Sequence, residues 1–266
     1  MRNSVPDNSI PVLALDRVSL VRNGKPILRE VTFTVAPGEH WAVVGKNGAG
    51  KSFLLRMIAG EHFPTTGAID VLGKRFGEYD LWKLKVHIGV VSDQLQARYH
   101  PDEPGEDIVL SGFFSSIGLY DRVTETMRRK AADLLARVGV AHLRERRFDE
   151  MSHGEQRRLL IARALVLDPA LLILDEPCTG LDIASREEFL SGLSAVAGTG
   201  VSILLVTHHL EEIIPEIGNV LFLKEGRVTA SGPKERLFDA AHLTRLFDHP
   251  VSVSRSHGRY FVRTDA

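Results

Sequence analysis

One glycine-rich segment has the residue types and the spacing of a phosphate-binding loop. The segment GKNGAGKS, residues 45–52, matches the pattern G-x-x-x-x-G-K-[ST] and stands between an apolar run and a helical pattern. Glycines let backbone N–H groups surround phosphate oxygens. The lysine places its charge beside the β and γ phosphates, and the final hydroxyl ligates Mg²⁺. The candidate phosphate contacts are Gly45, Lys46, Asn47, Gly48, Ala49, Gly50, Lys51 and Ser52.

Two acidic residues end a later apolar run, where they could act on a bound phosphate. In LLILDEP, Asp175 is expected to hold Mg²⁺ through water, and Glu176 to polarise the attacking water as a general base. His208 ends the next apolar run and could contact a γ-phosphate, although a lone histidine there is usually a packed or solvated side chain. The candidate catalytic residues are therefore Glu176, His208 and Lys51, and Asp175 joins Ser52 as a candidate metal ligand.

The segment MSHGEQRRLLIARAL, residues 151–165, begins with small or polar residues and continues as an apolar run with arginines. Ser152 and Glu155 have the spacing of a capping box, in which each side chain bonds a backbone N–H at the other's end. This pattern predicts a helix start, and a capped helix start is also a place where an anion binds. His153 and Glu155 lie too close together on one turn to predict a metal site without further ligands.

The rest of the pattern predicts the strands and helices that hold these residues. Alternating strands flank the pair Asn23-Gly24, which favours a tight hairpin turn. The apolar runs ALLILD and VSILLVTH are typical of parallel strands that are covered on both faces. Strand signals fade over residues 93–148, where helical periodicity predicts a mainly helical insertion. NVLFLKEGRVTASG resembles a closing hairpin, and a small terminal hairpin is expected around His257-Gly258.

The composition is that of an ordinary globular protein. Of 266 residues, 44% are hydrophobic and 25% charged, which allows a buried core. The net charge of −1 provides no basic excess for a nucleic-acid backbone, so no direct nucleic-acid binding is expected. Cys178 is the single cysteine, which excludes an internal disulfide and favours a reducing compartment. No apolar run approaches the roughly 20 residues that span a bilayer, so a membrane role requires a partner.

The order and spacing of these motifs resemble the nucleotide-binding subunit of an ATP-binding cassette (ABC) transporter. The phosphate loop, MSHGEQ, LLILDEP, TGLD with Asp182, and VTHH follow one another within about residues 12–240. MSHGEQ occupies the place of the family's signature sequence, usually Leu-Ser-Gly-Gly-Gln. The resemblance implies a head-to-tail homodimer around two Mg-ATP, in which the signature helix of one subunit faces the γ-phosphate held by the other. The signature residues that would act in trans are Ser152, His153, Gly154 and Glu155.

The resemblance also implies the fold and its boundaries. We expect an α/β fold, with a P-loop NTPase core, an N-terminal antiparallel β subdomain and an inserted helical subdomain. A single domain would cover residues 1–266. Its ATP-binding core would cover about residues 12–92 and 149–240, the helical subdomain about 93–148, and a short C-terminal extension about 241–266. Asp182 would lie in the segment that the family calls the D-loop.

In the signature segment, His153 and Glu155 replace the family's usual glycine and glutamine, and three further places depart from the family pattern. The family stacks adenine on an aromatic residue, whereas the matching place here is near Arg22, whose guanidinium can also stack on a flat ring. Phe53 follows Ser52 where threonine is usual, so one side-chain contact to phosphate is lost and the backbone N–H remains. The glutamine that senses Mg²⁺ aligns best with Asp93, and Gln94 stands next to it. Either residue could supply the oxygen.

These features predict an ATPase subunit that drives a separate integral-membrane permease. It would lie in the cytoplasm, peripherally on the inner face of the cell membrane. The absence of membrane spans and of a long regulatory extension points by analogy to the metal-chelate, siderophore or vitamin class of importers. The alternative is a soluble ABC-type ATPase that acts on ribosomes or nucleic acid. The aromatic segment SGFFSSIGLY lies where the family docks a permease helix, and it could equally be core of the helical subdomain.

Overall fold

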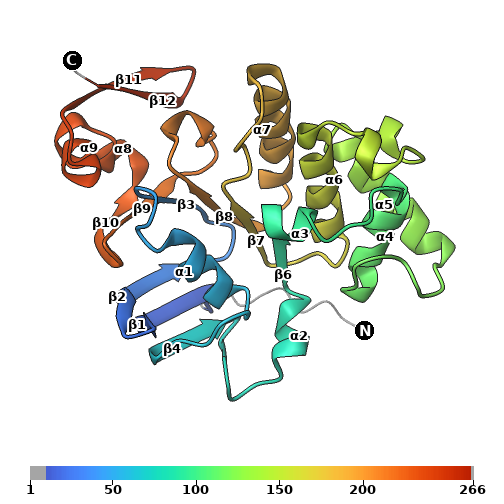
Figure 1. Ribbon diagram of the computed structural model, residues 1–266, viewed down its shortest axis with the longest axis horizontal. Coiled ribbons are helices and arrows are strands. Elements are labelled where there is room, and N and C mark those ends of the chain that lie inside the picture. Colours follow the sequence, from blue (N-terminus) through green and yellow to red (C-terminus); the bar gives the residue numbers. More distant parts are fainter. Residues whose placement is uncertain (1–9, 265–266) are drawn as a thin grey trace.

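The computed structural model describes residues 10–264 (Figure 1). Residues 1–9 and 265–266 of the expected single domain lie outside the described residues. A six-stranded sheet with the order β10-β9-β3-β8-β7-β6 forms the centre. Its strands are β3 (His40–Val44), β6 (Ile88–Val91), β7 (Leu171–Asp175), β8 (Ser202–Thr207), β9 (Asn219–Lys224) and β10 (Arg227–Pro233). β3 pairs in parallel with β8 and β9, and β7 pairs in parallel with β6 and β8, as the two apolar runs predicted. The hairpin expected from NVLFLKEGRVTASG is the antiparallel pair β9 and β10.

A second, antiparallel sheet packs beside the first and has the strand order β2-β1-β4-β5. Its strands are β1 (Leu13–Arg22), β2 (Lys25–Val35), β4 (Thr66–Val71) and β5 (Lys74–Arg75). Asn23 and Gly24 connect β1 to β2, and both have positive φ, 50° and 72°. Two consecutive positive φ angles characterise the type I′ hairpin turn, which explains why this dipeptide predicted the turn.

Alternating side chains of the parallel strands divide the hydrophobic core into two clusters. Val44, Leu174 and Leu205 face the cluster that includes helices α6 (His153–Leu165) and α7 (Ile183–Ala197). Val43 and Ile173 face the other cluster, which α1 (Lys51–Ile58) and the antiparallel sheet cover. Both faces of the sheet are therefore buried, which accounts for the near-continuous apolar sequences of β7 and β8.

The predicted insertion over residues 93–148 is mainly helical, with irregular segments between its helices. It contains α3 (Asp93–Gln96), α4 (Gly105–Ser111), α5 (Glu125–Arg137) and three short 3₁₀ turns, Gly112–Phe114, Ala141–Leu143 and Phe148–Glu150. In the aromatic segment, Phe113 packs partly against the core, while the side chain of Tyr120 is 84% exposed. The segment is thus partly core and partly surface, and its contact with a permease helix stays a prediction.

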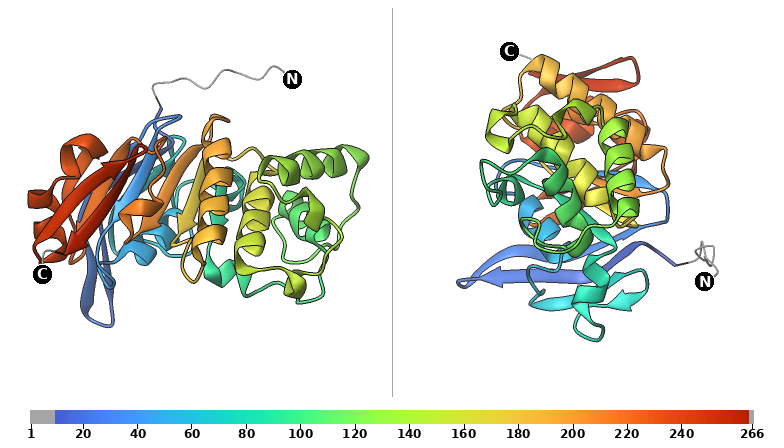
Figure 2. Two further views of the ribbon diagram at one scale, coloured as in Figure 1. Left: turned by 90° about the horizontal axis from the view of Figure 1, so that it is seen from above. Right: turned by 90° about the vertical axis from the view of Figure 1, so that its right-hand side faces the viewer.

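The remaining elements surround these layers. They are α2 (Leu81–Lys85), the 3₁₀ turn Leu210–Glu212, α8 (Lys234–Leu237), α9 (Ala240–Phe247) and the hairpin of β11 (Val251–Ser256) and β12 (Arg259–Thr264). The terminal hairpin turns at His257-Gly258 as expected. It lies at the opposite end of the molecule from the helical insertion (Figure 1, Figure 2). Among residues 10–264, no helix combines the length and the apolar character that crossing a membrane would require.

Candidate functional site

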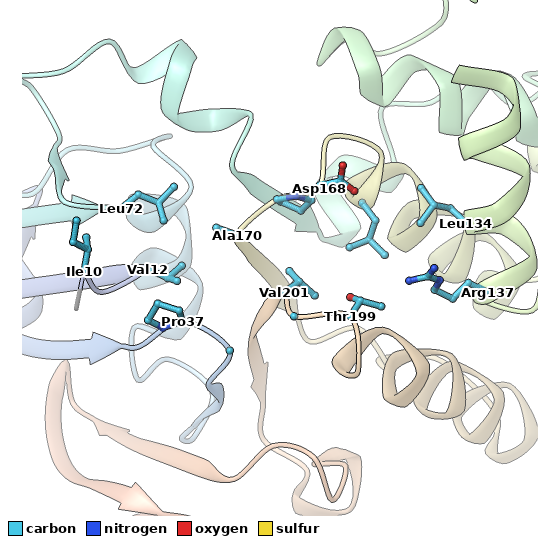
Figure 3. Close-up of a pocket in the computed structure, with 14 residues that line it drawn as sticks. Ile10, Val12, Pro37, Leu72, Leu134, Arg137, Asp168, Ala170, Thr199 and Val201 are labelled. Carbon is cyan, nitrogen blue, oxygen red and sulfur yellow. The ribbon is translucent and has the colours of Figure 1, made fainter. Parts of the chain in front are cut away.

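The candidate phosphate-binding and acidic residues meet at one edge of the central sheet. The loop of residues 45–52 follows β3, Asp175 ends β7, and His208 follows β8. Because β3, β8 and β7 are parallel neighbours, their carboxyl ends lie together, which is where ligands bind in open α/β sheets. A cavity of about 510 Å³ lies at the other end of the same strands, lined by Pro37, Ala170 and Val201 (Figure 3). This cavity is therefore separate from the phosphate loop.

The glycines of the loop are required by its shape. A Cβ on Gly45 would lie 2.2 Å from the carbonyl oxygen of Leu223, so no side chain fits there. Gly50 caps the start of α1 with φ 103°, a conformation that other residues rarely adopt. Gly48 is exposed with φ 82° and has nothing within 4 Å of its Cβ position. The loop therefore presents an open, side-chain-free face beside the amino end of α1, which suits a phosphate group.

Among the three candidate catalytic side chains, Glu176 contacts both of the others. The Lys51 side chain is only 4% exposed, and its Nζ donates to the carbonyl oxygens of Gly45 (2.9 Å) and Lys46 (3.2 Å). The same Nζ lies 3.2 Å from Oε1 of Glu176, which is also 3.4 Å from Nδ1 of His208. The structure thus brings Lys51, Glu176 and His208 together from three separate strand ends.

Ser52 and Asp175 form an oxygen pair that fits Mg²⁺. The Ser52 Oγ lies 3.4 Å from Oδ1 of Asp175. Burial raises the pKa of Asp175, and the neighbouring Glu176 charge raises it further, so a divalent cation here would relieve an unfavourable negative charge. Within residues 10–264, no group of three or more His, Cys, Asp and Glu side chains could hold a metal. Mg²⁺ fits such a site because it commonly uses one or two protein oxygens, substrate phosphates and water.

The two alternatives for the Mg²⁺-sensing residue have different surroundings. Asp93 is ion-paired with the buried guanidinium of Arg157. Gln94 lines a small cavity together with Ser92 and Asp175. We therefore propose Gln94 as the residue whose side chain serves the metal, with Asp93 engaged by Arg157.

Replacing Gln94 with alanine is expected to raise the Mg²⁺ concentration for half-maximal ATP hydrolysis by about 10–100-fold, as changes around metal ligands typically do. The matched substitution Asp93→Asn is expected to leave this concentration unchanged, whatever it does to the maximal rate. Titration of the ATPase rate with Mg²⁺ at saturating ATP measures both variants. The reverse pattern would assign the metal contact to Asp93.

The signature segment forms the predicted capping box. The backbone N–H of Glu155 donates to Ser152 Oγ (3.3 Å), and the Ser152 N–H donates to Glu155 Oε2 (2.8 Å). Ser152 and His153 are exposed, so this turn can face a partner. A Cβ on Gly154 would come within 3.0 Å of Cβ of Ser185, which packs the turn against the start of α7.

Asp182, the D-loop candidate, caps the start of a helix. It is the N-cap of α7, where its Oδ1 accepts the Ser185 N–H at 2.8 Å and its Oδ2 accepts the Ser185 hydroxyl at 3.1 Å. The D-loop candidate and the signature turn therefore meet through Ser185.

Arg22 and Phe53, which are far apart in sequence, lie beside each other. The Arg22 guanidinium carbon is 5.8 Å from the centroid of the Phe53 ring, and that of Arg56 is 5.9 Å from it. His62 stacks near the same ring at a centroid distance of 6.3 Å. Arg22 thus lies beside α1, and its contact with adenine stays a prediction.

Sequence reasoning missed a buried acid behind His208. Glu212 is 3% exposed, and its Oε2 accepts the Thr207 hydroxyl at 2.5 Å. The Thr207 oxygen in turn accepts the His209 N–H at 3.0 Å, which fixes the turn that carries His208. Burial raises the pKa of Glu212. An acid within the apolar run LEEII was the only available signal, and it did not indicate a partner.

A second missed contact reaches the phosphate loop from the C-terminal extension. Asp248, at the end of α9, lies 3.0 Å from Nζ of Lys46 and also pairs with Lys224. The Lys46 and Asp248 side chains are about half exposed, so this pair contributes little to stability. It nevertheless directs the Lys46 side chain away from the loop towards the extension.

Replacing Lys51 with alanine is expected to weaken Mg-ATP binding by about 10–100-fold, because a hydrogen bond from a charged group contributes about 1.5–3 kcal/mol. Isothermal titration calorimetry measures the affinity, and circular dichroism confirms folding. Lys83→Ala is a suitable control, because Lys83 is an exposed lysine of α2 that pairs with Asp80 and is not part of the phosphate loop. Unchanged ATP affinity in folded Lys51→Ala would contradict the phosphate-loop assignment.

The fold and the site define the general class of this protein. A parallel sheet with a phosphate loop after one strand and a paired acidic sequence after another is the arrangement of a P-loop nucleoside triphosphatase. The chain belongs to the ABC transporter family, because residues 28–179 match the family model described as ABC transporter. It is an ATP-binding ATPase subunit of that family, and both the resemblance and the α/β cassette fold are confirmed.

Individual relatives match nearly the whole chain. It is 44% identical over 254 residues to YlmA, an uncharacterized ABC transporter ATP-binding protein of Bacillus subtilis (strain 168). The match covers 94% of this chain and 96% of that protein. It is 31% identical over 244 residues to the hemin import ATP-binding protein HmuV of Bradyrhizobium diazoefficiens, covering 89% and 88% of the two chains. A solved structure described as a metal-chelate type ABC transporter in an inward-facing conformation has a TM-score of 0.77 and 25% identity, covering 96% and 97%.

Proposed function

We propose that this ATPase subunit powers import of a metal chelate, siderophore or vitamin through a separate permease. The observation that carries the substrate class is the end-to-end similarity to a hemin import protein and to a metal-chelate type transporter. Two copies would bind two Mg-ATP between them, and the permease would hold the pair at the inner face of the cell membrane. The proposed domain boundaries are those expected from the sequence.

In the proposed reaction, water attacks the γ-phosphorus of ATP held by the loop of residues 45–52, the bond to the β–γ bridging oxygen breaks, and ADP leaves. Glu176 accepts the proton of that water, since its carboxylate is the acid beside Lys51 and His208. Lys51 and His208 stabilise the charge that develops on the phosphate oxygens. A magnesium ion held by Ser52, Asp175 and Gln94 would supply further charge neutralisation. Lys51 now contacts loop carbonyls and Glu176, so it would exchange these partners for phosphate oxygens.

The signature turn would complete the partner's site. Ser152 uses an oxygen lone pair for the Glu155 N–H. Its hydroxyl proton is left available to a phosphate oxygen, since serine both donates and accepts. The amino end of α6 adds its partial positive charge. Capping and phosphate binding are therefore compatible in one residue.

The permease contact is proposed on the side of the helical insertion. A groove between α2, α3 and α6 is lined by Val86, Leu95, Gly112 and Arg163. Tyr120, which follows Gly112 in the aromatic segment, is also exposed. A groove lined by both apolar and polar side chains could receive a helix of a partner protein.

Affinity isolation from gently solubilised membranes tests the partner. One multi-span protein is expected to co-purify, and ribosomes or DNA in its place would overturn the transporter assignment. The purified pair is then reconstituted in liposomes, with ATP supplied in the compartment that holds the ATPase subunit. Import is expected to accumulate a metal chelate such as hemin in that same compartment. Glu176→Gln is the matched inactive control. ATP-driven movement out of that compartment would contradict import.

A further inference from the structure

A buried arginine of the signature helix contacts the acidic turn of its own subunit. Arg157 lies on α6, five residues after Ser152 or about 7.5 Å along the helix axis. Its side chain is 4% exposed. Nη1 donates to the backbone carbonyl of Glu176 at 3.2 Å, and Nη2 donates to that of Thr179 at 3.3 Å. Arg157 therefore connects the signature helix to the segment that follows β7.

The backbone at Glu176 is strained and is held from both sides. Glu176 has a φ of 45°, a conformation that costs a residue other than glycine about 1–3 kcal/mol. Its N–H donates to the carbonyl of Val206 in β8 at 2.9 Å. Its carbonyl accepts from Arg157 and from the Thr179 N–H, at 3.1 Å. The direction of the Glu176 carboxylate thus depends on contacts that include the Arg157 guanidinium.

The charge of Arg157 is balanced by the segment that enters the helical insertion. Nη2 is also ion-paired with Asp93, at the start of α3. A buried cation requires such a partner, because an unpaired buried charge is strongly destabilising. One guanidinium therefore joins α6, the Glu176 turn and α3, and its planar set of five donors suits three simultaneous acceptors.

We propose that Arg157 is a positioning residue, which sets the direction of the Glu176 carboxylate and links it to the signature helix. This inference rests on the proposed function, in which Ser152 at the start of α6 contacts ATP on the partner's side. When that contact forms, α6 is held at its amino end, and Arg157 transmits the position of α6 to Glu176 of the other ATP site. Each site then becomes competent for hydrolysis only when the neighbouring site is also occupied.

Arg157→Lys tests the proposal, because lysine keeps the charge and loses the planar donor set. The kcat for ATP is expected to fall about 10–100-fold, as misplacement of a catalytic group does, while KM and melting temperature change little. The matched control is Arg158→Lys. Arg158 is the next residue of α6, is also largely buried, and pairs with Glu188 of α7 at 2.7 Å. A wild-type kcat in Arg157→Lys, or an equal loss in both variants, would overturn the proposal.

A double-mutant cycle separates positioning from general packing. In Glu176→Gln, which lacks the carboxylate, adding Arg157→Lys is expected to change the residual rate less than twofold. Interacting residues are non-additive in this way, whereas a purely structural effect would multiply the two losses. If Arg157→Lys does not fold, the pair Arg157→Gln with Asp93→Asn removes both charges and is judged by the same criteria.

The ATP dependence of hydrolysis by the wild-type protein tests this proposal separately from the proposed function. ATP hydrolysis with a Hill coefficient above 1 is expected, falling to about 1 in Arg157→Lys, since the link between sites is lost. A wild-type Hill coefficient of 1 would overturn the link. Absence of a membrane partner or of chelate import would count against the proposed function and would leave the kinetics of Arg157→Lys to be judged separately.

Discussion

Glu176→Gln is expected to lower the ATPase kcat by about 10²–10⁴-fold, the usual contribution of a general base. Glutamine has nearly the shape of glutamate, so the contacts of Oε1 with Lys51 and His208 keep their geometry and only the proton-accepting charge is lost. ATP binding should persist. With hydrolysis slowed, two ATP should hold two subunits together, and light scattering should detect a dimer with ATP but not with ADP.

The control for this prediction is Glu187→Gln, a surface acid that pairs with Arg259 of the terminal hairpin. It should hydrolyse ATP at the wild-type rate. Phosphate release measured at saturating Mg-ATP compares the two variants directly. A Glu176→Gln protein with more than a tenth of wild-type activity would show that another group accepts the proton.

Adding Ser152→Gly to Glu176→Gln is expected to abolish the ATP-dependent dimer. A hydrogen bond from the Ser152 hydroxyl to a charged phosphate contributes about 1.5–3 kcal/mol, and a symmetric dimer contains two such contacts. The dimer dissociation constant should therefore rise roughly 10²–10⁴-fold. Sedimentation or light scattering across a range of protein concentrations measures this constant.

If Ser152 acts only as a helix cap, a different result is expected for Ser152→Gly. Glycine is nearly as good an N-cap as serine and costs roughly a few tenths of a kcal/mol, whereas alanine costs about 0.5–2 kcal/mol. The melting temperature of Ser152→Gly should therefore stay close to wild type, so that loss of the dimer reports the phosphate contact. Normal ATP-dependent dimerisation of the double variant would reduce Ser152 to a helix cap.

Local sequence determined much of the architecture because the physical cause lies within a few residues. Asn23-Gly24 specifies its turn by accepting positive φ at both positions. The apolar runs of β7 and β8 indicate burial on both faces without any knowledge of the neighbours. The capping box forms between Ser152 and Glu155 on a single helical turn, so its spacing was sufficient to predict the bonds.

The phosphate loop could also be predicted from the sequence, because its shape depends on backbone conformations that only glycine permits. Gly45 and Gly50 occupy positions where a side chain would clash or a positive φ is needed, and those demands appear directly as glycines in the sequence. The side-chain chemistry of Lys51 and Ser52 follows from the same motif. Their placement beside Glu176 required only that parallel strands of one sheet, here β3 and β7 with β8 between them, end at the same edge.

Tertiary structure alone decided the partners of the charged side chains. The sequence leaves Asp93 and Gln94 as alternatives for the Mg²⁺-sensing residue, and only the structure shows that the Asp93 carboxylate is paired with Arg157, which comes 64 residues later. The buried bond of Thr207 to Glu212 and the pair of Lys46 with Asp248 likewise arise only when separate segments are packed together. Ion pairs and hydrogen bonds depend on distances of a few ångströms between elements, and sequence periodicity carries no such distances.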